Sequence, residues 1–299
     1  MKKIILLLVT ITICLAEGNA QVLTPEDNSV YKKEKHKNKL VQEYSPLRQA
    51  DVMWSRKIWR EIDMRQKINH PFYYPMNNGD EQAVTTDDRK SLIDVIYGAV
   101  LEGTITAYGS ATYDDEFRFP MTDEEILTVG NAEQKIQVMY DEELISQGVD
   151  AELATYDSVI NVPFDRNIIK KWRLKEEWFF DKQRSVMDVR IIGIAPLQED
   201  RDEVNNELLG TFSPIFWVYF PEARKVLINS EVFNLVKNDA ERRTYDDIFW
   251  KRMFGSTIVK ESNVMNRNVD EYMIGLDALL EAERIKAEIF NIEHDLWEY

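Results

Sequence analysis

Apolar side chains recur along the chain at spacings that predict which element each segment forms. Trp54, Ile58 and Ile62 recur every four residues, a spacing typical of one helical face. We expect this helix to end before Pro71. The segment PFYYP that follows is expected to be extended, because proline disfavours helical backbone in the residue before it.

The next signals predict two capped helices with a strand between them. Thr85 and Asp88 form a capping-box pattern ahead of RKSLIDVIYGAVLEG, and Gly103 closes the helix that this segment predicts. The segment TITAYG predicts a strand, and Thr122 with Glu125 caps the short helix DEEILTVG. The apolar stripe of the first helix comprises Leu92, Ile96 and Val100.

The second half of the chain predicts helix, then strands, then helices again. After Pro163, helical spacing leads into a β-branched run from Val186 to Ala195. The segment SPIFWVYFPEARKVLINS predicts two strands joined by a turn at residues 221–224, and TYDDIFWKRMFG predicts a capped helix. Residues 269–299 predict one long helix whose stripe comprises Met273, Leu276, Leu280, Ile289, Ile292 and Leu296. The pattern therefore indicates an α+β fold with a long C-terminal helix.

Three of the segments with helical spacing combine tryptophan with cations: SRKIWR, IIKKWRLKEEW and DIFWKRMFG. The first two are each followed by a strand-like run that ends in proline. This likeness is compatible with two related α+β units, 50–120 and 121–299, within a globular region 50–299. Chance among seven tryptophans also produces such a likeness.

The first residues predict export. An apolar run over residues 4–15 follows two lysines, and small residues occupy the positions that signal peptidase reads. The run is shorter than the roughly 20 apolar residues that span a bilayer. We expect residues 1–20 to be a signal peptide cleaved between Ala20 and Gln21, with no direct membrane span in the mature chain.

Residues 21–49 differ in composition from the rest of the chain. They carry six cations against four anions and few bulky apolar side chains. Such a segment is too polar to fold alone, so we expect a flexible, extended arm. A more specific hypothesis is that this basic arm lies on the surface of an acidic neighbouring molecule.

Charge and cysteine content exclude several kinds of protein. The chain has 37 basic and 53 acidic residues and a formal net charge of −16, which argues against nucleic acids or anionic lipid surfaces as partners. Its one cysteine, Cys14, lies in the predicted signal peptide. The exported chain would therefore have no thiol for a disulfide, a metal site or a nucleophile.

Catalytic patterns are missing from the sequence. The three histidines, His36, His70 and His294, share no metal-ligand spacing, and no GxSxG, HExxH or glycine-rich phosphate loop occurs. Adjacent carboxylates such as Glu176 and Glu177 are expected by chance among 53 acidic residues. The sequence predicts no catalytic, cofactor-binding or metal-binding residue, and hence no enzyme.

Tryptophan and tyrosine beside cations suggest contact with other proteins. Aromatic and arginine side chains are enriched at the centres of interfaces, so we take Trp59, Arg60, Arg65, Tyr73 and Tyr74 as candidate interface residues. Core packing explains the aromatic side chains equally well.

Four long segments carry a family resemblance. DVMWSRKIWREIDMRQKINHPFYYP, WFFDKQRSVMDVRIIGIAP, TFSPIFWVYFPEARKVLINSEVFN and YMIGLDALLEAERIKAEIFNIEHDLWEY resemble the gliding-motility family GldN, also called PorN, of the type IX secretion system. The resemblance implies a non-enzymatic periplasmic component, associated with the outer membrane, that forms a ring with the lipoprotein GldK (PorK) and contacts GldM (PorM).

Two other classes of protein remain open from the sequence. An exported hydrolase or carbohydrate-binding protein would need a cleft lined by aromatic side chains and two carboxylates. A monomeric, chaperone-like periplasmic factor would show no self-association.

Overall fold

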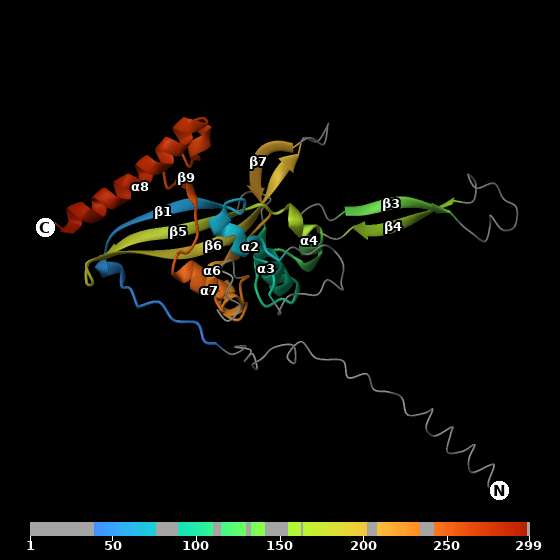
Figure 1. Ribbon diagram of the computed structural model, residues 1–299, viewed down its shortest axis with the longest axis horizontal. Coiled ribbons are helices and arrows are strands. Elements are labelled where there is room, and N and C mark those ends of the chain that lie inside the picture. Colours follow the sequence, from blue (N-terminus) through green and yellow to red (C-terminus); the bar gives the residue numbers. More distant parts are fainter. Residues whose placement is uncertain are drawn as a thin grey trace, which may run out of the picture. The chain divides into compact units, whose positions relative to one another are not determined.

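The computed structural model describes residues 39–75, 89–109, 115–129, 133–140, 155–162, 164–201, 208–233 and 242–297 (Figure 1). Residues 38 to 299 form one compact unit. The predicted signal peptide with Ala20 and Gln21, the arm up to residue 38 and the Thr85–Asp88 capping pattern lie outside the described residues. These three interpretations stay predictions.

One antiparallel sheet organises the described chain. Its strand order is β2-β8-β6-β5-β1-β9, with β7 paired to β6. The strands are β1 (Val52–Asp63), β2 (Ala107–Gly109), β5 (Lys171–Asp181), β6 (Val186–Arg201), β7 (Leu208–Pro214), β8 (Phe216–Tyr219) and β9 (Thr257–Glu261). A second antiparallel pair consists of β3 (Glu133–Tyr140) and β4 (Thr155–Val162).

Short helices and one long helix accompany the sheet. They are α2 (His70–Tyr73), α3 (Leu92–Leu101), α4 (Asp123–Leu127), α6 (Phe220–Leu227), α7 (Tyr245–Trp250) and α8 (Leu276–Trp297). Single 3-10 turns cover Gln49–Asp51, Lys67–Asn69, Arg166–Ile168 and Val269–Glu271. The mixture of helices and antiparallel strands confirms the predicted α+β class and the C-terminal helix.

Two apolar clusters hold these helices to the sheet. In the larger one, sheet residues such as Trp172, Leu174 and Ile194 pack with residues of α2, α3, α6 and α7, and Figure 1 shows α3, α6 and α7 grouped there. The smaller cluster holds α8 against β1 and β9 through Ile58, Ile258, Ala282, Ile285 and Ile289. The main core therefore lies beneath the short helices, and α8 has its own attachment.

The helix predicted around Trp54, Ile58 and Ile62 is wrong, because residues 52–63 form strand β1. Residues 171–181, for which helical spacing was also expected, form β5, and the two strands pair antiparallel along their length. A spacing of four satisfies both a helical face and every second position of a strand. Strands from the ranges 50–120 and 121–299 share the one sheet.

Two segments predicted to be extended or turned are helical instead. The stretch around PFYYP contains α2, and the expected turn at residues 221–224 belongs to α6. In both, a proline occupies one of the first two helical positions, where its fixed φ suits a helix and its missing N–H costs nothing. Of the two strands predicted from SPIFWVYFPEARKVLINS, the first is confirmed as β8. The second is wrong, because residues 225–227 belong to α6.

Most of the predicted capped helices are confirmed. Thr122 caps α4 and Thr244 caps α7, each in a complete capping box. The helix closed by Gly103 is α3, and Gly103 has the positive φ of 69° expected there. This helix begins after Ser91, whose side chain accepts a hydrogen bond from the backbone N–H of Asp94.

The long C-terminal helix begins later than predicted. It starts at Leu276 rather than at residue 269, after a 3-10 turn and Gly275, whose φ is 63°. The predicted apolar stripe combines two faces of this helix: Leu276 and Leu280 are exposed, whereas Ile289 is buried. This division is the basis of the surface described below.

Candidate interaction surfaces

Trp59, one of the predicted interface residues, is buried within the chain. Its side chain is 7% exposed and packs with Ala195 and Trp217. The indole Nε1–H donates to Asp115 Oδ2 at 2.7 Å. The Lys260 ammonium lies 4.6 Å from the ring centroid, within the range of a cation–π contact. Trp59 is therefore held by bonds inside its own chain.

A buried lysine shares this environment. The Lys175 Nζ donates to the backbone carbonyl of Asp115 at 2.7 Å and lies 5.5 Å from the Trp59 ring centroid. Burial lowers the pKa of the Lys175 ammonium, and the Asp115 carboxylate partly opposes that shift. These contacts anchor the segment that carries Asp115 to the sheet.

The two predicted arginines differ in exposure. Arg60 is half-buried, and its guanidinium donates to Ser256 Oγ at 2.9 Å. Arg65 is exposed and binds the Asp63 carboxylate, with Nη2 to Oδ2 at 2.7 Å. Partial burial is the largest single influence on the Asp63 carboxyl and raises its pKa. The hydrogen bonds from the Arg65 guanidinium and backbone N–H together outweigh burial, so the pKa is lowered.

Tyr73 and Tyr74 lie at the end of α2. Tyr73 packs against the main core, whereas Tyr74 is 37% exposed and its ring meets those of His70 and Tyr73 edge-on. Of the five predicted residues, Trp59 and Tyr73 pack with two different apolar clusters. The role of all five at an interface stays a prediction.

The outer face of α8 is the apolar surface that the sequence reasoning missed. Side chains on it expose large fractions: Leu276 70%, Leu279 53%, Leu280 59% and Phe290 66%. The segment between β9 and α8 also exposes Met265 at 70% and Ile274 at 86%. Large apolar side chains exposed together on one helix are typical of interaction sites on soluble proteins.

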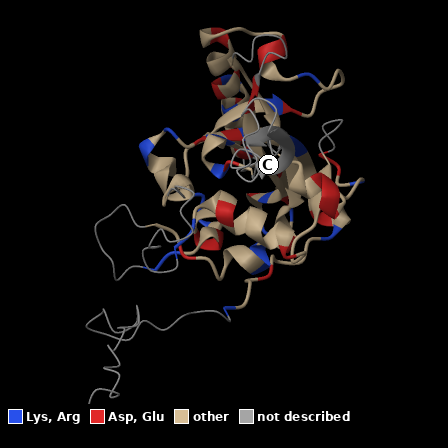
Figure 2. Cartoon of the chain, turned by 90° about the vertical axis from the view of Figure 1, so that its right-hand side faces the viewer, with Lys and Arg blue, Asp and Glu red and all other residues tan. Residues whose placement is uncertain are grey.

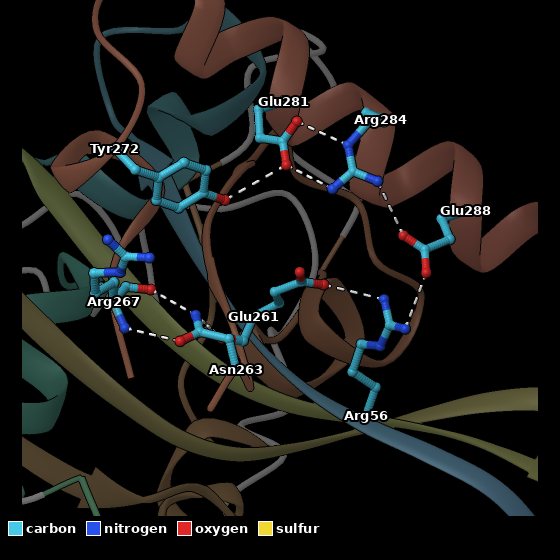
Figure 3. Close-up of polar contacts among 8 residues, drawn as sticks. All are labelled: Arg56, Glu261, Asn263, Arg267, Tyr272, Glu281, Arg284 and Glu288. Carbon is cyan, nitrogen blue, oxygen red and sulfur yellow. Dashed lines mark hydrogen bonds and ion pairs between the residues drawn. The ribbon is translucent and has the colours of Figure 1, made fainter. Parts of the chain in front are cut away.

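Polar contacts fix the inner side of α8 to the sheet (Figure 3). Arg56 of β1 donates to Glu261 of β9 at 3.0 Å and to Glu288 of α8 at 3.1 Å. Within α8, Arg284 bridges Glu288 and Glu281. The helix is therefore held by charge-assisted hydrogen bonds as well as by its apolar contacts.

The preceding turn is tied to the same network. The Tyr272 hydroxyl donates to Glu281 Oε1 at 3.5 Å, and the Asn263 side chain donates to the backbone carbonyls of Glu261 and Arg267. The hydrogen bond from Arg284 lowers the pKa of the Glu281 carboxyl, and the one from Arg56 lowers that of Glu288. These contacts hold the exposed apolar side chains of α8 on a fixed support.

Charge over the described residues is mixed. Figure 2 shows Lys and Arg segments interspersed with Asp and Glu segments. In the part of the chain that the structure describes, no group of three or more His, Cys, Asp or Glu side chains is placed to hold a metal ion. Among these residues, no helix has both the length and the apolar character to cross a membrane.

Comparison with known proteins gives the family. The family described as gliding motility associated protein GldN matches residues 47–298. The chain belongs to the GldN family. The match covers both β1 and α8, so it includes the sheet and the exposed helix face alike. No curated protein matches the sequence.

Proposed function

We propose that this GldN-family chain is a structural component of the type IX secretion machinery that supports gliding. In this proposal it works in the periplasm, associated with the outer membrane through the lipoprotein GldK (PorK). It forms a ring with that lipoprotein and contacts the periplasmic region of GldM (PorM). The observation that carries the proposal is the family match over residues 47–298, whose description is gliding motility.

The surface chemistry supports a role based on contacts with other proteins. The α8 outer face presents large apolar side chains on a helix that is itself anchored by Arg56 and Ile285. The titratable groups described around Trp59 are engaged in ion pairs and hydrogen bonds within the chain. A rigid body with an exposed apolar face suits assembly into a larger structure.

A chromosomal deletion tests the proposal. Cells without the gene should lose gliding over surfaces and retain type IX cargo inside, and a plasmid copy of the wild-type gene should restore both. The level of the lipoprotein should fall in the deletion strain, since each partner stabilises the other by binding its folded form. Normal secretion in the deletion strain would reject the assignment.

Ring formation is tested separately. Co-expressed chain and lipoprotein should purify together as an assembly far larger than a one-to-one complex, because repeated heterologous contacts close into rings. The lipoprotein expressed alone is the control. Recovery of the two proteins as separate monomers would contradict the ring.

A further inference from the structure

The stretch that precedes β1 packs on the rest of the chain as a strap, which comprises residues 39–47. It contains no helix or strand, and Figure 1 shows it, in blue, as an extended trace. Over the described residues, its N–H groups and carbonyls make no hydrogen bond to another backbone group. Most of its side chains are exposed, and Leu40 is 90% exposed. A segment with so few bonds can detach while the rest of the chain stays folded.

Tyr44 anchors the strap. Its ring stacks on Trp250, with the ring centroids 5.1 Å apart and an angle of 23° between the planes. The guanidinium of Arg224 lies 4.7 Å from the Tyr44 ring centroid, and that of Arg190 lies 5.0 Å from it. Arg190 also donates from Nη2 to the backbone carbonyl of Ser45 at 2.6 Å. One indole and two guanidinium groups therefore define a slot for a tyrosine in extended backbone.

The walls of this slot are held in place without the strap. Arg224 of α6 is fixed by Asp246 of α7 through hydrogen bonds of 2.7 Å and 3.1 Å. Trp250 is the last residue of α7, and Arg190 belongs to β6. The family match begins at residue 47, so it includes the whole slot but not the tyrosine that fills it. The slot and its occupant are thus separate parts of the chain.

The strap fills this site only in part. A cavity of about 490 Å³ remains beside Tyr44, between the strap, β6 and the helices α6 and α7. Its lining includes Gln42, Arg184, Asp188, Phe249 and Arg252. In addition, the buried Nε of Arg190 has no hydrogen-bond partner among the described residues. A ligand that used the remaining space as well would bind more tightly than the strap does.

We propose that this slot is a binding site for an extended, tyrosine-bearing segment of another protein, and that the strap closes it until such a segment displaces Tyr44. The strap of a second copy is chemically identical, so it cannot displace a tethered strap below about millimolar concentration. The displacing segment must bind better than the strap, and the unfilled cavity permits this. The site does not rest on the secretion role, and it is tested with the purified chain alone.

Tethering determines how far the strap hides the slot. A short flexible tether gives the strap an effective concentration of about 1 mM. With a dissociation constant of about 100 μM for the free strap sequence, the slot is then closed about ten times as often as it is open. A free copy of the strap should therefore bind wild type about tenfold more weakly than a chain whose own strap lacks Tyr44.

A synthetic peptide tests this competition. The probe is fluorescein-labelled KLVQEYSPLR, the sequence of residues 39–48, and fluorescence anisotropy measures its binding. The Tyr44→Ala chain should stay folded and bind the probe about tenfold more tightly than wild type does. A probe with alanine in place of its tyrosine should bind neither chain. Equal binding of the probe to both chains, or to neither, would overturn the proposal. So would a Tyr44→Ala chain that does not fold, because the strap would then be part of the core.

A substitution in the wall of the slot shows where the probe binds. In the Tyr44→Ala chain, Trp250→Ala should weaken probe binding by about tenfold, since the stacking partner of the probe's tyrosine is lost. Trp250 is 41% exposed, so its truncation leaves the core intact. Phe290→Ala, at a 66% exposed ring on α8, is the matched control and should leave binding unchanged. Full binding by the Trp250→Ala chain would place the probe elsewhere and overturn the assignment.

A larger side chain tests the cavity. Gln42 of the strap lines it, so a probe with Gln42→Trp has an apolar group to place in the unfilled space. This probe should bind the Tyr44→Ala chain about threefold or more tightly than the strap sequence does. It should also bind wild type more tightly, because it competes better with the tethered strap. If the larger side chain brings no gain, the cavity takes no part in binding, and displacement of the strap by a better-fitting segment is refuted.

Discussion

Arg224 and Asp246 form a buried pair that connects α6 with α7. The guanidinium is 2% exposed and donates to the carboxylate at 2.7 Å and 3.1 Å. The Tyr44 ring lies 4.7 Å over the guanidinium and stacks on Trp250 at 5.1 Å. A planar guanidinium can bind a carboxylate with two nitrogens and stack on an aromatic ring at once, so this pair also holds the chain that precedes β1.

Truncation of the carboxylate in this pair should destabilise the fold strongly. Asp246→Ala leaves Arg224 buried without its counter-ion, and the expected loss is about 3–5 kcal/mol in the free energy of unfolding. Urea unfolding measures it. Lys286→Ala, on the exposed side of α8, is the matched control and should change stability by about 0.5 kcal/mol or less. A loss for Asp246→Ala as small as that of the control would show that the pair does not hold these helices.

Two variants separate what the Trp59 ring contributes to stability from what its indole N–H contributes. Trp59→Phe keeps most of the buried ring but removes the indole donor to Asp115, whose carboxylate still has Lys175 at 3.4 Å, and should cost about 1–3 kcal/mol. Trp59→Ala also creates a cavity beside Trp217 and should cost about 3–5 kcal/mol. Chemical unfolding of both variants gives the two values. If both variants unfold like wild type but assemble poorly, Trp59 acts at an interface after all.

At the scale of single elements, the residues that cap helices could be predicted from the sequence, whereas the positions of the strands could not. Thr122 and Thr244 cap α4 and α7 through local side-chain bonds that need no tertiary partner. The spacing of Trp54, Ile58 and Ile62 fits a helix and a strand equally well, and pairing with β5 decides between them. Such long-range hydrogen bonds leave no local signal in the sequence.

The outer face of α8 could be predicted from the sequence only in part, for a related reason. The sequence predicts the helix that carries Leu280 and Ile289, but apolar side chains lie on two faces of α8 and nothing local shows which face packs on the sheet. Packing against Ile58 and Ile258 of β1 and β9 settles the choice. The interface residues predicted around Trp59 rest on residue type alone, and type does not distinguish a core tryptophan from an exposed one.

Attachment of α8 should weaken in acid. Its hydrogen bond with Arg56 lowers the pKa of the Glu288 carboxyl below the ordinary value of 4.5. A lowered carboxyl pKa contributes stability that is present above the unfolded value and is lost as the pH falls through the folded one. We expect the protection of α8 amides against exchange, taken relative to the intrinsic exchange rate at each pH, to fall below about pH 4.5, and to fall more than in α3.

Arg56→Met is the variant that isolates this contribution. It should destabilise α8 at pH 7 by about 1 kcal/mol or less, because both partners are partly exposed. Between pH 6 and about 3.5, the Arg56→Met chain should lose less of its remaining α8 protection than wild type loses. Equal pH dependence in the two chains would show that this ion pair does not control the helix.

At the scale of the whole molecule, the two faces of α8 separate folding from assembly. Ile285 and Ile289 are buried against the sheet, whereas Leu280 and Phe290 are exposed on the same helix. Damage to the inner face should therefore reduce the amount of folded chain, and damage to the outer face should leave a folded chain that lacks a contact. A net charge of −16 helps to keep such a chain soluble.

The last prediction compares the two faces in cells that lack the gene. Leu280→Ser with Phe290→Ser should accumulate to wild-type levels and melt like wild type, but restore little gliding or secretion if the outer face makes an essential contact. Ile285→Ala with Ile289→Ala should cost about 4–10 kcal/mol, since each buried isoleucine truncated to alanine costs about 2–5, and the protein should be degraded. Immunoblots, melting curves and gliding assays on the same strains distinguish the two effects. Full restoration of gliding by the outer-face variant would show that this surface is dispensable, however exposed and apolar it is.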